Sequence, residues 1–281
     1  MTADLFYRKL RRDLLPIAGE AAAYEAKELA GFILHLKESE LPTLPFLKKE
    51  VPQEAEILAE SLLLRRKHHE PLEYILGYAW FYGLRFSVSS ACLIPQADTE
   101  IVCEKLILRL QNGMHFADIC TGSGCIALTA LANTKNTTAI GYDISADALD
   151  IAQKNAENLG LSHRFEIRRS DVFAEDFLAD AGEFDVIVSN PPYIETDVIG
   201  TLTPEVQNEP HIALDGGTDG LRFYRRLLEV CPKHIKKGGI LLFEIGYDQR
   251  NALAELCEPY AFTYECYRDF GGNDRVFAIR F

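Results

Sequence analysis

Apolar residues recur along the chain with two different spacings, and the change from one spacing to the other divides the chain into two regions. Near the N-terminus they lie three or four positions apart, as at Phe6, Leu10 and Leu14, which predicts amphipathic helices. A further helix is expected over 52–67, after a proline-containing loop at 41–45. The pattern from the N-terminus to about residue 75 therefore predicts a small helical domain.

From about residue 115, short apolar runs alternate with helical segments. Alternation of this kind is typical of a parallel sheet with helices on both faces. The last two strands are joined only by Phe270–Asp274, which is too short for a crossover helix, so they must form an antiparallel hairpin. The expected strands are 115–120, 138–143, 165–171, the apolar run 186–188, 239–245, 262–269 and 276–281.

A linker joins these two regions. Residues 80–88 predict a hairpin that turns near Gly83, and a helix is expected to run to Leu110. We therefore expect a helical domain at 1–75, a hairpin and helix linker at 76–110, and an α/β domain at 111–281. A separate helical domain ahead of an α/β domain suggests an adaptor for a macromolecular substrate.

The composition is that of a soluble globular protein, with 281 residues of which 48% are hydrophobic and 25% charged. No apolar run approaches the roughly 18 residues of a membrane span, so we expect a cytoplasmic protein and no membrane partner. The seven cysteines include no Cys-x-x-Cys pair, which predicts reduced thiols and no metal site. No additional interface segment is evident, and a monomer is expected.

The net charge of −13 is unevenly distributed. Residues 1–75 contain 11 Lys or Arg and 13 Asp or Glu, so most of the negative charge belongs to the remainder of the chain. An acidic α/β domain repels phosphate backbones, which weighs against a nucleic-acid substrate.

The strongest chemical signal follows the apolar run 186–188, where a predicted strand ends in Asn190-Pro191-Pro192-Tyr193. A planar NH2 group is a poor nucleophile, and methylating it requires both N–H bonds to be held. The Asn190 oxygen can accept one and a backbone carbonyl of the Pro191-Pro192 turn the other, while Tyr193 offers a flat face for the substrate. The alternative is a simple strand-terminating turn, because Asn-Pro often opens one.

A glycine-containing turn between a strand and a helix is the candidate cofactor site. It is followed 19 residues after its last glycine by Asp143, which ends the next expected strand and can accept hydrogen bonds from both ribose hydroxyls. The turn consists of Cys120, Thr121, Gly122, Ser123 and Gly124.

The third expected strand adds Asp171, placed to accept from an adenine amino group, and Val172, placed against the ring. A helix N-cap before Phe173 is the structural alternative for Asp171. Taken alone, the turn also fits a dinucleotide fingerprint. The closing antiparallel hairpin and the Asn190–Tyr193 motif favour S-adenosylmethionine instead, since the motif has no role in hydride transfer.

With these segments in place, the chain resembles the HemK/PrmC family of release-factor glutamine methyltransferases along nearly its whole length. The resemblance implies a class I S-adenosylmethionine methyltransferase, a Rossmann-like α/β fold with a seven-stranded sheet and a terminal antiparallel hairpin, preceded by a small helical domain. It also implies N5-methylation of the glutamine in the Gly-Gly-Gln loop of peptide chain release factors. The matching segments are Tyr74–Gly77, Leu93–Pro95, Thr121–Gly124, Asn190–Tyr193, Glu209–Leu214 and Gly216–Gly220.

Two positions depart from the family pattern. Cys120 stands where the family usually has glycine, and its side chain is expected to crowd the methionine end of the cofactor or to change its affinity. Gln96 replaces the family's arginine, which removes any cofactor or interdomain contact that the arginine would make.

Three alternatives remain open from the sequence. A glutamine methyltransferase for a ribosomal protein would share most of these features. An adenine-N6 methyltransferase of nucleic acid would use the same Asn190–Tyr193 motif but should carry a basic groove. A non-enzymatic cofactor-binding scaffold would have no need of that motif.

Overall fold

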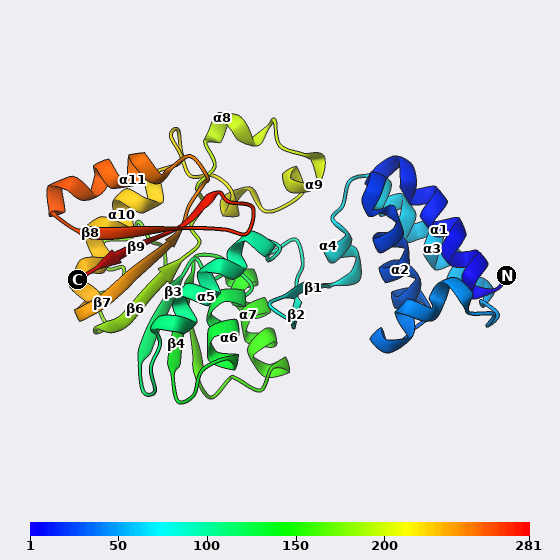
Figure 1. Ribbon diagram of the computed structural model, residues 1–281, viewed down its shortest axis with the longest axis horizontal. Coiled ribbons are helices and arrows are strands. Elements are labelled where there is room, and N and C mark those ends of the chain that lie inside the picture. The colour runs from blue at the N-terminus through cyan, green and yellow to red at the C-terminus, as the bar shows by residue number, and fades with distance from the viewer. The chain divides into compact units, whose positions relative to one another are not determined.

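The computed structural model describes residues 1–281, which form two compact units (Figure 1). The first unit comprises Met1–Gly77 together with Pro204–Asn208, and the second comprises Tyr78–Thr203 and Glu209–Phe281. Most of the linker expected at 76–110 therefore belongs to the second unit. No helix in either unit combines the length and the apolar character that crossing a bilayer requires.

The first unit is a helical domain whose core comes from the regularly spaced apolar side chains of its helices, with Phe6, Leu10 and Leu14 all buried. Residues 38–46, in which a loop was expected, form a 3₁₀ helix despite Pro42 and Pro45. The helices are α1 (Ala3–Ala18), α2 (Ala22–Ile33), α3 (Gln53–Lys67), α4 (Leu72–Leu76) and the short α9 (Pro204–Gln207).

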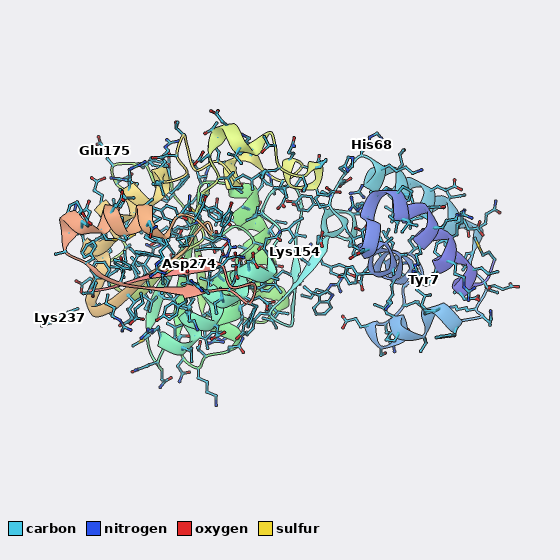
Figure 2. The ribbon with its side chains drawn as sticks, turned by 45° about the horizontal axis from the view of Figure 1, so that its top comes forward. Tyr7, His68, Lys154, Glu175, Lys237 and Asp274 are labelled. Carbon is cyan, nitrogen blue, oxygen red and sulfur yellow. The ribbon has the colours of Figure 1, made fainter.

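A buried arginine ties this unit together. Arg66 of α3 is 5% exposed, and its Nε and Nη2 atoms donate to the Glu25 carboxylate of α2 at 2.9 and 3.0 Å. Its Nη1 atom lies 3.3 Å from Oε1 of Glu205 in α9. Figure 2 labels Tyr7 of α1 and His68 at the end of α3 in the same unit. Removing Arg66 would leave Glu25 as an uncompensated buried charge, which is costly.

The second unit contains a seven-stranded sheet in the order β5-β4-β3-β6-β7-β9-β8 (Figure 1). The first five strands of this order are parallel, and β9 pairs antiparallel with β7 and β8. This confirms the predicted class I methyltransferase fold. The strands are β3 (His115–Ile119), β4 (Thr138–Asp143), β5 (Phe165–Arg169), β6 (Phe184–Ser189), β7 (Ile235–Glu244), β8 (Thr263–Arg268) and β9 (Asp274–Arg280).

Each face of the sheet packs against its own set of helices, because successive strand residues point to opposite faces. On one face, Phe116 and Val188 pack in a core with α5, α6 and α7 and with the hairpin. On the other face, Ile119 and Phe243 pack against α10 and α11. These elements are the hairpin strands β1 (Tyr78–Phe81) and β2 (Leu84–Ser87) and the helices α5 (Glu100–Arg109), α6 (Cys125–Ala132), α7 (Ala146–Asn158), α10 (Arg222–Val230) and α11 (Arg250–Cys257).

Strand β7 begins earlier than the apolar pattern predicted. The strand was expected at 239–245, but α10 ends at Val230, and a 3₁₀ turn leads into β7 at Ile235. The pairing of β6 with β7 shifts register after Phe184, which accommodates the residues before Gly239 as an irregularity in the strand. The start of β7 was not predicted because Lys236 and Lys237 interrupt the apolar pattern there.

Candidate active site

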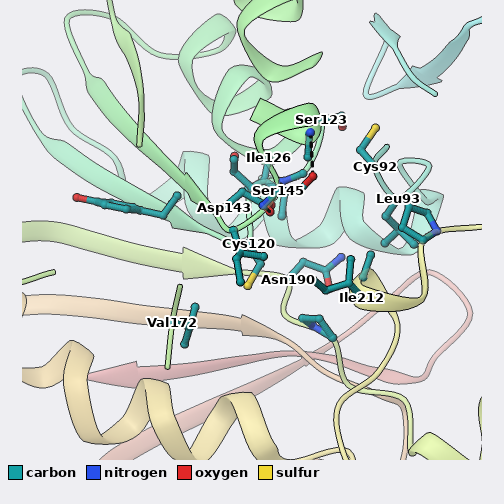
Figure 3. Close-up of a pocket in the computed structure, with 18 of the residues that line it drawn as sticks. Cys92, Leu93, Cys120, Ser123, Ile126, Asp143, Ser145, Val172, Asn190 and Ile212 are labelled. Carbon is teal, nitrogen blue, oxygen red and sulfur yellow. Dashed lines mark hydrogen bonds between the residues drawn. The ribbon is translucent and has the colours of Figure 1, made fainter. Parts of the chain in front are cut away.

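A cavity of about 270 Å³ lies at the carboxyl ends of the parallel strands (Figure 3). Strand β3 is flanked by β4 on one side and β6 on the other, which makes this the switch point where ligands bind in open α/β sheets. The walls are mostly apolar, with a few polar groups. They include Cys92, Leu93, Ile94, Pro95, Thr99, Cys120, Thr121, Gly122, Ser123, Ile126, Asp143, Ser145, Asp171, Val172, Phe173, Asn190, Pro192, Ile212, Arg222 and Phe223.

The glycine-containing turn after β3 forms the floor of this cavity. A buried carboxylate beneath it, Asp118, accepts hydrogen bonds from Thr121 Oγ1 at 2.7 Å and from the Ala127 amide at 3.2 Å. Gly122 has φ +54°, and a Cβ added there would meet no protein atom within 4 Å, so the backbone is open to a ligand at this point. Gly124 lies outside the cavity wall, has φ +77°, and packs close to α7, since a Cβ added there would lie 3.3 Å from the Cβ of Ala152.

Asp118 has no solvent exposure, and burial raises its pKa to about 7. The two hydrogen bonds that it accepts oppose this rise, but its Oδ1 atom has no partner. The native state therefore holds the Asp118 proton more tightly than the unfolded chain does.

Asp143 at the end of β4 faces the cavity from beside the turn. Its Oδ2 accepts from the Gly122 amide at 2.9 Å, and its Oδ1 accepts from the Ser145 amide at 3.0 Å. Burial raises its pKa, and these backbone donors oppose the rise. Each carboxylate oxygen can accept a second hydrogen bond, so Asp143 can still bind a pair of hydroxyls.

The segment after β5 contributes an apolar wall. Val172 is buried, and the Phe173 and Phe223 rings meet edge to face with their centroids 5.0 Å apart. The guanidinium of Arg222 lies 4.1 Å from the Phe173 centroid. Asp171 is exposed at the cavity edge, and its Oδ1 accepts from the Phe173 amide at 2.8 Å, which is the local turn contact foreseen as the alternative for this residue.

Asn190 enters the cavity from the end of β6, on the strand next to the glycine-containing turn (Figure 3). Its Nδ2 atom lies 3.5 Å from Oγ1 of Thr99, a buried residue just before α5. With Nδ2 turned toward Thr99, the Oδ1 atom is the part of the amide that remains to accept a hydrogen bond.

Tyr193 does not line the cavity. Its hydroxyl donates to Glu244 Oε1 at 3.3 Å, and its carbonyl accepts from Gln249 Nε2 at 2.9 Å. Burial raises the pKa of the Tyr193 hydroxyl, and the Glu244 carboxyl adds to the effect. The ring thus packs behind the Asn190 turn, in contrast to the expectation that its face would meet the substrate.

A second glycine-rich loop, residues 216–220, packs against the turn that contains Asn190 and Tyr193. A Cβ added at Gly216 would lie 2.7 Å from the Tyr193 Cα, and one at Gly220 would lie 2.4 Å from the Tyr193 carbonyl oxygen. Only glycine allows this approach of the two backbones. Nearby, the Glu209 carboxylate accepts from the Ile94 amide at 2.8 Å and so fixes the Leu93–Pro95 wall of the cavity.

Cys120, the first residue of the turn, has φ +61°, a left-handed conformation that is unfavourable for a residue with a Cβ. The side chain borders the cavity beside Val172 and Asn190 (Figure 3). Burial raises the pKa of its thiol well above the ordinary value, so the group is an unreactive thiol at neutral pH. Backbone geometry at this position favours glycine.

The structure gathers nine of the residues expected to form the site around one cavity and leaves three outside its wall. Those on the wall are Cys120, Thr121, Gly122, Ser123, Asp143, Asp171, Val172, Asn190 and Pro192. Outside it lie Gly124, Pro191 and Tyr193. The sequence reasoning did not identify Thr99, Phe173 or Phe223 as site residues. Phe173 directly follows the predicted Asp171 and Val172, which could have pointed to it, whereas no local pattern marks Thr99 or Phe223, and folding brings these two to the cavity.

Comparison with protein families gives two matches along the chain. Residues 8–77 match the PrmC N-terminal domain, and residues 96–208 match the Methyltransferase small domain. The first match coincides with most of the helical unit, and the second contains the glycine-containing turn and Asn190.

Comparison with individual proteins agrees with these two family matches. A release factor glutamine methyltransferase of Agrobacterium fabrum is 40% identical over 238 residues, covering 82% of this chain and 81% of that protein. Another of that name from Caulobacter vibrioides is 34% identical and covers 94% and 92%. Among solved structures, a methyltransferase from Pyrococcus furiosus superposes with a TM-score of 0.52 at 19% identity, covering 71% of this chain and 90% of that one, which is a likeness of fold.

The pKa of Asp118 makes stability depend on pH. Because the native pKa of about 7 lies above the ordinary 3.8, this residue favours the native state at low pH, and its contribution is lost as pH rises through 7. Relative to the Asp118→Asn variant, the wild type should lose up to about 1.4 kcal/mol of unfolding free energy per pH unit between pH 5 and 7. Urea unfolding of both proteins across this range measures the difference, and parallel pH profiles would contradict the assignment.

The left-handed conformation at position 120 predicts an order of stability between two variants. Cys120→Gly and Cys120→Ala both remove the thiol, but only alanine keeps the Cβ that is strained at φ +61°. The glycine variant should therefore be the more stable by about 1 kcal/mol. Urea denaturation compares the two directly, and an alanine variant of equal or greater stability would show that the backbone is not strained there.

Proposed function

The chain belongs to the release factor glutamine methyltransferases, and from that premise we propose that it transfers a methyl group from S-adenosylmethionine to the side-chain amide nitrogen of a glutamine in a peptide chain release factor. The observation that carries the proposal is the position of Asn190, at the end of β6 and on the wall of the cavity that Asp143 also borders. The expected target is the glutamine of the Gly-Gly-Gln loop.

The cavity suits the cofactor in its chemistry. Asp143 offers carboxylate oxygens that can accept from ribose hydroxyls, and Gly122 leaves its backbone open to close approach. Val172 and the aromatic pair Phe173 and Phe223 supply an apolar surface for a flat ring. Bound there, S-adenosylmethionine supplies an electrophilic methyl group.

The residues of this chain orient the acceptor nitrogen. In the proposed complex, Asn190 Oδ1 accepts one N–H of the substrate amide and a backbone carbonyl of the Pro191-Pro192 turn, of which Pro192 lines the cavity, accepts the other. Holding both N–H bonds fixes the plane of the amide, so that the nitrogen lone pair, which is perpendicular to that plane, faces the methyl donor. The N–C bond would form as the methyl–sulfur bond of the cofactor breaks, leaving a neutral thioether, and the nitrogen would release one proton to water, so the site needs no strong base beside it.

Alignment is the main source of acceleration in such a site. Well-oriented reactants save about 7–11 kcal/mol of the activation free energy relative to the same groups free in solution. The apolar walls also exclude water, which strengthens the hydrogen bonds that hold the amide.

The Asn190→Ala variant tests the proposal together with a choice of acceptors. The wild type with labelled S-adenosylmethionine should label a release factor, and not a ribosomal protein or DNA, under identical conditions. The variant should lose at least about 100-fold in transfer rate, because misalignment of a reacting group costs that much, and it should keep most of its cofactor binding, although Asn190 also borders the expected cofactor site. Filter binding measures the label and calorimetry the cofactor. Transfer to DNA, or full activity of the variant, would overturn the proposal.

The contact between Gly216 and the Tyr193 backbone predicts a second effect on the rate. In Gly216→Ala, the added Cβ must displace the turn that contains Asn190 and Pro191, since it would lie 2.7 Å from the Tyr193 Cα. We expect kcat to fall by about 10-fold or more while cofactor affinity is unchanged. Gly200→Ala is the matched control, because a Cβ there meets no atom within 4 Å. Equal kcat in the two variants would exclude this role of the loop.

A further inference from the structure

A fully buried asparagine joins two parts of the cavity. Asn155 of α7 has no solvent exposure, and its side chain bonds to Ser123 in the glycine-containing turn and to Ser87 at the end of β2. We propose that Asn155 is a positioning residue that fixes this turn relative to the wall segment, residues 91–95, and so sets the width of the cofactor cavity between them. This inference rests on the proposed methyl transfer and adds to it a residue outside the cavity wall that controls how tightly S-adenosylmethionine binds.

The Asn155 amide makes three hydrogen bonds, all of them to backbone atoms. Its Oδ1 atom accepts from the Ser87 amide at 2.7 Å, and its Nδ2 atom donates to the Ser87 carbonyl at 3.0 Å and to the Ser123 carbonyl at 2.9 Å. A backbone amide can only donate and a carbonyl can only accept, so these partners fix which way round the Asn155 amide lies. The contact therefore holds the chain itself at residues 87 and 123, whatever the two serine side chains do.

On the side of the turn, the contact fixes a complete peptide unit. The Ser123 carbonyl accepts from Asn155, and the Gly124 amide of the same peptide unit donates to the Thr121 carbonyl at 2.8 Å. Gly124 also packs close to Ala152, which lies on the same face of α7 as Asn155 because the two are three positions apart. This face of α7 therefore holds the floor of the cavity in place.

On the other side, the contact fixes the chain that leads to the wall segment. Ser87 ends β2, and a short turn closed by the Cys92 amide brings the chain to the cavity. Within the wall segment, the Ile94 amide donates to the Glu209 carboxylate at 2.8 Å. Asn155 thus holds the wall segment at its approach and Glu209 holds it further along, so the wall is tied to the same side chain as the floor.

These contacts concern the cofactor part of the cavity. Asn190 follows β6, which pairs with β3 and β7, and the hydrogen bonds of the Asn155 side chain go to neither β6 nor its turn. Loosening the floor and the wall segment should therefore weaken binding of S-adenosylmethionine. Once the cofactor is bound, the alignment of the acceptor at Asn190 should be preserved, which is the pattern of an altered Kd with an unaltered kcat.

Asn155→Leu tests the inference, because leucine fills a similar volume and removes all three hydrogen bonds. With the variant folded by circular dichroism, its Kd for S-adenosylmethionine should rise about 10-fold or more, because three buried backbone groups lose their partner. In release factor methylation at saturating cofactor, kcat should stay within about twofold of the wild type. Calorimetry measures the Kd, and labelled S-adenosylmethionine measures kcat.

Arg164→Met is the matched control. Arg164 donates to the backbone carbonyls of Leu131 and Thr134 at 2.7 and 3.1 Å, and it lies outside the cavity wall. Both variants should lose stability in urea, since each removes hydrogen bonds to the backbone, but only Asn155→Leu should lose affinity for the cofactor. A purely structural role of Asn155 would not separate the two.

Hydrogen exchange of the wild type tests the same link without a substitution. Coupling is reciprocal, so if the Asn155 contacts favour S-adenosylmethionine, the bound cofactor must strengthen them by the same factor of about 10. Exchange of the Ser87 amide, which donates to Asn155, should therefore slow when saturating S-adenosylmethionine is added. The Tyr82 amide is the matched control, because it belongs to the same hairpin but donates to Glu100 at 2.7 Å, and its exchange should slow less.

Two outcomes would overturn the positioning role. One is an equal Kd for S-adenosylmethionine in Asn155→Leu and Arg164→Met, and the other is protection of the Ser87 amide no greater than that of the Tyr82 amide. If Asn155→Leu does not fold, the exchange experiment decides alone. A wild type that binds no S-adenosylmethionine or labels no release factor would instead refute the proposed function, so the two failures are distinguishable.

Discussion

The site depends on the parallel pairing of β3 with β4 on one side and β6 on the other. Parallel pairing brings the carboxyl ends of these strands to one edge of the sheet. The turn after β3, Asp143 at the end of β4 and Asn190 after β6 therefore lie close together as a direct result of the strand order. The register pairs Ile119 with Ser189, which puts Asn190 beside Cys120. A slip of one residue would send the Asn190 side chain to the opposite face of the sheet.

Beneath this edge the protein buries two carboxyls, Asp118 and Glu244, each with one oxygen that has no partner. Both have their pKa raised to about 7 by burial. Asp118 accepts from Thr121 of the glycine-containing turn and from the Ala127 amide of α6, and thereby holds the turn against the start of that helix. Glu244 accepts from the hydroxyl of Tyr193, in the turn that also contains Asn190. A buried carboxyl with an unpartnered oxygen costs stability at both places.

Much of this arrangement is predictable from the sequence, because it depends on local rules. The alternation of strands and helices predicted the sheet, and the short link Phe270–Asp274 predicted its antiparallel edge. The positions of Asn190 and Asp143 at strand ends predicted that both would lie at the site. The remainder depends on tertiary contacts that no local pattern encodes. Tyr193 follows Asn190 closely in the chain, yet the close approach of Gly216 and the acceptor Glu244 turn its ring away from the cavity.

The chemistry at Asn190 does not by itself distinguish a glutamine amide from an adenine amino group, since both are planar NH2 groups with a delocalised lone pair. Selectivity must therefore come from what reaches the site. The wall of the cavity near Asn190 includes Pro210 and Ile212, from the stretch of chain that follows α9, and α9 itself is held in the helical unit by Arg66. The chain thus passes from the Asn190 turn to the helical unit and back within about twenty residues, so the segment that borders the cavity continues directly into a part of the helical unit.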